Sequence, residues 1–225
     1  MPFEGFTQST LDFMWELRFN NNKLWFEEHR AAYQRDLQAP MKALANDVFA
    51  RIAEGFGGRG FRCRVSRINK DARRNHGDGP YRDHLWFSIE RPEEEWTTAP
   101  VFWFELSPDG WSYGMGYYLA RPETMAKLRA RIDKNPKAFE RFIAPLAKRE
   151  EFVLDGDEYK RKKQAPTPKT APWYNKKTFS LIHEGQHGPE IFSSALSDRI
   201  AGGFAFLMPF YDYFVTLNAD PTPGT

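Results

Sequence analysis

The spacing of hydrophobic residues changes twice along the chain, and this limits the fold more than any other feature. From Lys23 to Glu54, apolar side chains recur every three or four residues, as on one face of an amphipathic helix. Between Phe61 and Tyr118, runs of apolar residues alternate with polar ones, which is typical of half-buried strands. Helical spacing returns after Arg121. Helices at both ends of a strand-rich middle predict an α+β fold.

The strand-rich middle is expected to form an antiparallel meander of about four to six strands. Its strand-like runs are 61–68, 85–90, 101–106, 111–118 and a short one at 179–182. The sequence Ser107-Pro108-Asp109-Gly110 is a turn signal that predicts a hairpin between two of these runs. We expect this meander to pack against the N-terminal and C-terminal helices in a single domain, 1–225, because composition changes sharply nowhere.

The helical segments have recognisable ends. Asn20-Asn21-Asn22 ends a short first helix, and Pro40 predicts a kink in the second. After Pro122, two helical pieces are expected on either side of Asn135-Pro136, and Pro189 is expected to open the last helix. Residues 155–176 contain three prolines and predict an irregular surface segment.

The composition predicts a cytoplasmic protein. Its single cysteine, Cys63, excludes a disulfide framework and any thiolate-rich metal centre. Glu4 and Asp12 interrupt the first residues, so no signal peptide is expected. The most apolar window, 200–211, has 12 residues, fewer than the roughly 20 that cross a membrane. We therefore expect no association with membranes.

One short motif resembles a zinc site. His183-Glu184-Gly185-Gln186-His187 has the residue order of a zinc peptidase, which requires both imidazoles on one helix. Gly185 and the following Gly188-Pro189 disfavour that helix, so we interpret residues 183–189 as a loop between a strand and a helix. We expect no metal site, and no other pattern indicates a cofactor.

The net charge of +2 is unevenly distributed. Residues 59–84 contain eight Lys/Arg and three Asp, a local charge of +5. Residues 160–177 contain seven Lys/Arg and no acid, a local charge of +7, which leaves −10 for the rest. The second run is interpreted as a solvated, flexible face. The first run is more informative because carboxylates lie among its arginines.

Within the first run, residues 67–84 predict a site for a small ligand that carries phosphate or carboxylate. Arginine offers a rigid fork of donors for such groups. The candidate anion donors are Arg67 and Arg73, with Asp71 orienting them. Asn69 shares a strand face with Arg67, while Tyr81 and His84 are candidates for hydrogen bonding or acid–base chemistry.

Two alternatives remain open. The arginines and Asp71 also suit an internal network that pairs its own charges, in which case the protein is structural or an interaction partner. Basic residues interleaved with Tyr81 and Trp86 also suit nucleic acid. However, the pI of 8.6 lies below the value above 9 expected of a dedicated nucleic-acid-binding domain. The sequence defines neither an activity nor an oligomeric state.

The same segment resembles the family known as domain of unknown function 2461. The family pattern is Arg-x-x-Arg-Asp-x-Arg-Phe, then an acid or Asn before Lys, then Pro-Tyr. Arg67, Asp71, Arg73 and Pro80-Tyr81 match it, and residues 21–26 resemble the opening of the family. The departures are Lys70 for arginine, Arg74 for phenylalanine and Gly77-Asp78 where an acid–lysine pair is expected, so that lysine is absent. The resemblance implies an α+β domain and a charged segment, without an activity.

Overall fold

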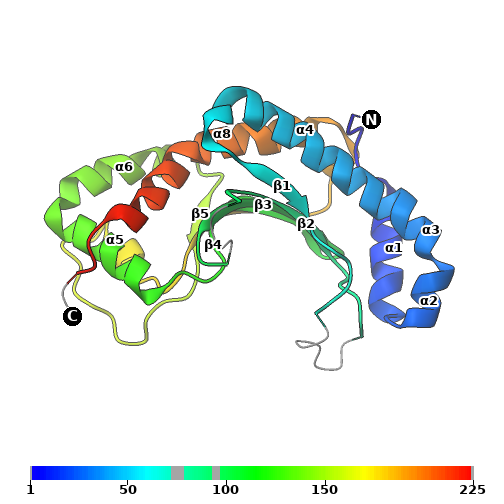
Figure 1. The fold of residues 1–225 in the computed structure, drawn as a ribbon, viewed down its shortest axis with the longest axis horizontal. Coiled ribbons are helices and arrows are strands. Elements are labelled where there is room, and N and C mark those ends of the chain that lie inside the picture. The colour runs from blue at the N-terminus through cyan, green and yellow to red at the C-terminus, as the bar shows by residue number, and fades with distance from the viewer. Residues whose placement is uncertain (1, 72–78, 93–96, 224–225) are drawn as a thin grey trace. The chain divides into compact units, whose positions relative to one another are not determined.

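The α+β prediction is confirmed by the computed structural model, which describes residues 2–71, 79–92 and 97–223 (Figure 1). The α-helices are α1 (Gln8–Phe19), α2 (Lys23–Glu28), α3 (Arg30–Ala32), α4 (Ala39–Phe56), α5 (Pro122–Lys134), α6 (Pro136–Lys148), α7 (Ala171–Tyr174) and α8 (Ala195–Val215). Shorter helical turns are η1 (Tyr33–Gln38), η2 (Gly57–Arg59), η4 (Pro189–Phe192) and η5 (Thr216–Ala219).

The strands that the structure describes form one antiparallel sheet of six. They are β1 (Arg62–Val65), β2 (Leu85–Glu90), β3 (Pro100–Ser107), β4 (Gly110–Tyr117), β5 (Val153–Asp155) and β6 (Ser180–Gly185). Their order across the sheet is β1-β2-β3-β4-β6-β5, which places β1 at an edge. The first four strands follow chain order, as in the predicted meander, and the predicted turn at 107–110 joins β3 to β4.

Two details at the β5–β6 end differ from the sequence prediction. Strand β5 was not predicted; it pairs with β6 in the register Val153↔Ile182 and Asp155↔Ser180. Strand β6 continues through Gly185, so His183 lies in a strand and the predicted loop is shorter. Three residues are too few to show alternation, so a strand of that length depends on its partner.

The last helix begins later than Pro189 predicts. Pro189 opens only the short turn η4, and Ser193 then adopts an extended conformation. The Ser193 hydroxyl accepts a hydrogen bond from the Ala195 N–H at 3.0 Å, which satisfies the first backbone donor of α8.

The predicted kink at Pro40 takes the form of a π-helical turn, η1, that immediately precedes α4. Within it, the Ala39 N–H donates to the carbonyl of Gln34, five residues back. Pro40 has no N–H to offer the Asp36 carbonyl. The buried Thr10 hydroxyl of α1 donates to that carbonyl instead, at 2.6 Å. A contact with another helix therefore replaces a bond that the proline removes.

The chain divides into two compact units. Unit 1 comprises Met1–Ile89, Trp103–Tyr113 and Glu184–Ala205. Its core is aromatic: Phe104 stacks with Phe87 at 5.7 Å and with Phe6 at 6.3 Å between ring centroids. Helix α4 contributes Leu44 and Val48, both with no exposed surface, to this unit.

Unit 2 comprises Glu90–Phe102, Gly114–His183 and Phe206–Thr225. Phe214 is the centre of its core, with Phe179 at 4.7 Å and Trp173 at 5.8 Å. At its surface, Arg131 of α5 binds Asp220 with two nitrogens.

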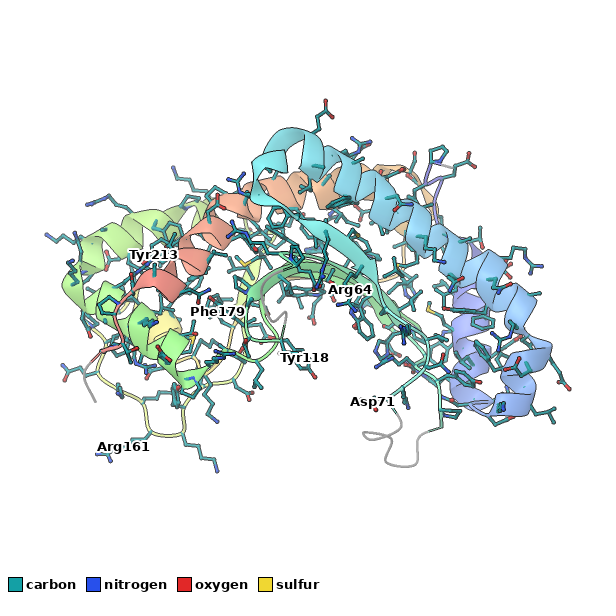
Figure 2. The ribbon with its side chains drawn as sticks, in the orientation of Figure 1. Arg64, Asp71, Tyr118, Arg161, Phe179 and Tyr213 are labelled. Atoms are coloured by element: carbon teal, nitrogen blue, oxygen red, sulfur yellow. The ribbon has the colours of Figure 1, made fainter. Side chains whose placement is uncertain are left out.

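The basic run 160–177 is solvated as predicted over most of its length, since six of its seven Lys/Arg are exposed, but its end is held against the fold. Buried Lys176 donates to the Gly156 carbonyl at 2.6 Å and lies 3.8 Å from Glu158. Glu158 also pairs with Lys162 at 3.0 Å. The buried Asn175 side chain accepts from the Lys163 N–H at 2.8 Å. The acids that were missing from the run lie just before it; Arg161 is exposed (Figure 2).

One helical stretch, Ala195–Ala219, is long and apolar enough to span a membrane by length and composition alone. The length of the most apolar window, 200–211, had predicted no such stretch. Within the fold, 56% of its most apolar window is buried, which is typical of the core helix of a soluble domain.

Candidate anion-binding site

The segment singled out by sequence analysis extends the β1–β2 pair beyond the sheet as a two-stranded arm. The Ser66 N–H donates to the Trp86 carbonyl at 2.8 Å. Further out, the backbone N–H of Lys70 donates to the Pro80 carbonyl at 2.9 Å, and the backbone N–H of Arg82 donates to the Ile68 carbonyl at 2.7 Å. These bonds make Asn69 and Tyr81 opposite partners in an antiparallel bridge. The arm holds both halves of the motif at fixed positions.

Asn21, between α1 and α2, fastens this arm to the helices. Its side-chain amide donates to the Tyr81 carbonyl at 2.8 Å, and its oxygen accepts from the Tyr81 N–H at 3.0 Å. Gly79 has a φ of +79° and approaches so closely that a Cβ there would lie 2.4 Å from the Asn21 carbonyl oxygen. Only glycine fits this approach without strain.

An aromatic stack continues the attachment. The Tyr81 ring stacks on Phe26 of α2 at 4.0 Å between centroids, and Tyr33 lies 5.4 Å from Phe26. All three side chains are at most 5% exposed. Burial raises the pKa of both tyrosines. The phenols therefore stay neutral and keep their O–H donors at physiological pH.

Between this arm and the helices lies a cavity of about 540 Å³. Its lining combines four cationic side chains, one carboxylate, several neutral hydrogen-bonding groups and an apolar floor. The lining residues are Lys23, Phe26, Glu27, Arg30, Tyr33, Gln34, Gln38, Lys42, Val65, Ser66, Arg67, Ile68, Asn69, Pro80 and Tyr81. The volume lies within the roughly 300–1,000 Å³ typical of small-molecule sites.

The charges of this cavity do not balance. Its only carboxylate, Glu27, is held by Arg30 through two hydrogen bonds of 2.9 and 2.6 Å, and this pairing lowers the Glu27 pKa. Lys23, Lys42 and Arg67 form no ion pair with any carboxylate in the described part of the chain. Three positive charges are therefore left over along the lining.

The structure brings together three of the six residues predicted for the site. Arg67, Asn69 and Tyr81 all line the cavity. Asp71 does not line it and is exposed at the outer end of the arm (Figure 2). Arg73 lies outside the described residues, so its predicted role is not addressed.

His84 belongs to a different cluster. Its Nδ1 lies 2.9 Å from Asp83, and Arg18 of α1 donates to Asp83 at 2.6 Å and to Asp109 at 2.6 and 3.0 Å. Burial opposes ionisation of Asp83, but the hydrogen bonds from His84 and Arg18 outweigh it and lower the Asp83 pKa. The histidine is engaged in a network of paired charges.

A second cavity, of about 250 Å³, is acidic. It is lined by Glu105, Asp109 and Glu184, together with Ser107, Gly110, Trp111, Ser112, Gly185 and Gln186. Burial raises the Glu105 pKa, and the nearby Asp83 acts in the same direction. The three carboxylates in its lining make this cavity unsuitable for an anion.

Sequence reasoning missed the helical half of the cationic cavity. Lys23, Glu27, Arg30 and Gln34 are spaced by four, three and four residues, which is the spacing of one helix face; the structure distributes them over α2, α3 and η1. That spacing was available as a signal. However, it identifies a charged face, which most surface helices have, and gives no sign of the arm that faces it.

The sequence 183–187, which has the residue order of a zinc peptidase, does not lie on a helix. His183 lies in β6 and binds the Glu151 carbonyl at 3.1 Å. His187 follows the strand and binds the Ser107 carbonyl at 2.9 Å. Among the described residues, no cluster of His, Cys, Asp and Glu suits a metal ion.

The fold and the cavity together define an α+β protein with a cationic cleft beside the edge strand of its sheet. The chain matches the family described as conserved hypothetical protein (DUF2461) over residues 9–213, and it belongs to that family. Comparison with curated proteins gave no match. The family establishes no activity.

Proposed function

We propose that the protein binds a small anionic ligand, one that carries phosphate or carboxylate, in the cleft lined by Lys23, Lys42 and Arg67. The observation that carries this proposal is the charge imbalance of the lining. Like charges gathered around a cavity repel one another, and an anion that enters relieves this repulsion. A lining shaped only by stability would place carboxylates among these cations.

The neutral groups of the lining support the same class of ligand. Gln34, Asn69 and the hydroxyl of Tyr33 add hydrogen-bond donors to the cations. Charge-assisted hydrogen bonds to phosphate or carboxylate are roughly twice as strong as neutral ones. The side chains of Phe26 and Tyr81 provide a rigid, buried support.

Thermal unfolding with inorganic phosphate, phenyl phosphate and citrate tests the proposal. A ligand at about 100 times its Kd should stabilise the fold by about 2.7 kcal/mol. Arg67→Met should lower the affinity at least tenfold while the melting temperature of the free protein changes little, because Arg67 is exposed.

Arg141→Met is the matched control, since Arg141 is an exposed arginine of α6 outside the cleft lining. It removes the same charge and should leave the affinity unchanged. If Arg67→Met and Arg141→Met weaken binding equally, the effect comes from net charge and the cleft is not the site.

A further inference from the structure

The cationic cleft runs along the free edge of the sheet. Five consecutive residues of the outgoing strand of the arm, 65–69, line the cavity, whereas the returning strand contributes only Pro80 and Tyr81. Strand β1, which leads into this segment, is an edge strand of the sheet. The cavity therefore follows this edge segment over residues 65–69.

Backbone N–H groups at this edge are available to a ligand. The ladder bonds of Ser66, Ile68 and Lys70 point toward the returning strand. In an antiparallel pair the residues between them point their N–H and C=O groups the other way. The N–H groups of Arg67 and Asn69 therefore face the free edge, and both residues line the cavity.

The carbonyl groups at the same edge are already occupied. Nη1 of Arg82 donates to the Arg67 carbonyl at 2.9 Å and also to the Asn69 carbonyl. A peptide that added a strand to this edge would need these acceptors. An anion has only acceptors to offer, so it can use the free N–H groups without needing the carbonyls.

The cations are spread over the length of the edge. The Ala45 carbonyl of α4 contacts the Cys63 thiol of β1, and Lys42 precedes Ala45 by one turn of the same helix. Lys42 therefore lies at the end of the cavity that is lined by Val65. Arg67 lies in the middle of the edge.

At the other end, Asn69 pairs with Tyr81, and Tyr81 stacks on Phe26. The Arg30 guanidinium lies over the Phe26 ring, 5.5 Å from its centre. Lys23 precedes Phe26 by one turn of α2 and also lines the cavity. At about 3.3 Å per residue, the span from Val65 to Asn69 is roughly 13 Å.

Building on the proposed function, we propose that the ligand is an elongated bis-anion, with two phosphate or carboxylate groups joined by an apolar or aromatic body. One anionic group is held by Lys42 and the other by Lys23, with Arg67 between them. The body packs on Val65, Ile68 and Pro80. A single phosphate would leave most of the 540 Å³ empty.

Calorimetric titration with two series of probes tests this inference. The first contains α,ω-alkane bisphosphonates of increasing length, and the second contains the corresponding dicarboxylates. Alkyl phosphonates and monocarboxylates with the same bodies are the mono-anionic references. Affinity should peak where the charged groups are about 10–13 Å apart, at least tenfold above the mono-anion. The series that binds more tightly identifies the anionic group.

Lys42→Met separates the two proposals. It should reduce the affinity for the best bis-anion to about that of the mono-anion and cause a smaller loss for the mono-anion, which keeps Lys23 and Arg67, whereas Lys42→Arg should preserve both. If mono-anions bind as tightly as every bis-anion, or if Lys42→Met weakens both classes equally, the two-point ligand is wrong while anion binding stands. If neither class binds, the proposed function fails as well.

Discussion

Two charged clusters of unit 1 use the same residue types and arrange them in opposite ways. Around Arg18, each charge has a partner: the guanidinium binds Asp83 and Asp109, and Asp83 binds His84. Around the cleft, Lys23, Lys42 and Arg67 share a lining whose one carboxylate already belongs to Arg30. The first arrangement fastens α1 to the sheet. The second leaves positive charge for a ligand, and its apolar support supplies the stability that its charges do not.

The largest loss of stability and of anion affinity should come from removing the side chain of Asn21, which attaches the arm to the helices. Asn21→Ala removes both hydrogen bonds to the Tyr81 backbone, so unfolding free energy should fall by about 2 kcal/mol. Anion affinity should fall too, because the arm is no longer fixed against α2. Urea denaturation measures the first effect and calorimetry the second.

Asn46→Ala, on the exposed side of α4, is the control and should leave stability within about 0.5 kcal/mol of wild type. If Asn21→Ala retains full affinity, the arm is held by the aromatic stack alone.

A smaller loss of stability is expected when the cluster of paired charges around Arg18 is broken. Asp83 has a folded-state pKa below its usual value of 3.8, so its ionisation stabilises the fold above about pH 4. That stabilisation is lost as the pH falls through the folded-state pKa. Arg18→Met should destabilise the protein by about 1 kcal/mol at pH 7. The difference from wild type should shrink between pH 5 and pH 2 because the Asp83 pKa rises in the variant.

Denaturation curves at several pH values measure this difference. Anion affinity at pH 7 should remain unchanged, since Arg18 does not line the cleft. A loss of affinity would show that the two clusters do not act separately.

The smallest effect on stability is expected from Glu27→Gln, which increases the excess of positive charge in the cleft. Glu27→Gln removes the one carboxylate of the cleft and releases Arg30. Stability should stay near that of wild type, and anion affinity should rise by about fivefold at low salt. At about 0.5 M salt the gain should disappear because screening weakens exposed charges.

Glu28→Gln is the matched control, as Glu28 is exposed on the same helix and does not line the cleft. Equal gains from both variants would mean that overall charge, and not the cleft, attracts the anion.

Much of the fold was predictable because its signals are local. The turn at Ser107–Gly110 and the alternation in β2 and β3 need only neighbouring residues to be recognised. The position of β6 between β4 and β5 was not predictable, since it depends on a pairing between distant segments. Asn175 and Lys176 likewise look like surface residues in the sequence, and tertiary hydrogen bonds bury them.

The site was half predictable for a related reason. Arg67, Asn69 and Tyr81 lie within one motif, so residue chemistry and the family resemblance both indicated them. Lys42 is 25 residues earlier in a helix whose apolar face dominates the pattern. His84 was assigned to the wrong neighbours, because its own partner, Asp83, is shared with Arg18, 65 residues away.

The hydrogen bonds of Arg82 also bear on solubility. An exposed edge strand offers unpaired backbone groups to any other strand, and such edges are where sheets join into aggregates. Arg82 covers two carbonyls of the strand that continues β1 and places a positive charge beside them. A second molecule that approached this edge would meet a charge and too few acceptors. The same side chain thus protects the sheet from self-association while it leaves the N–H groups of the edge open.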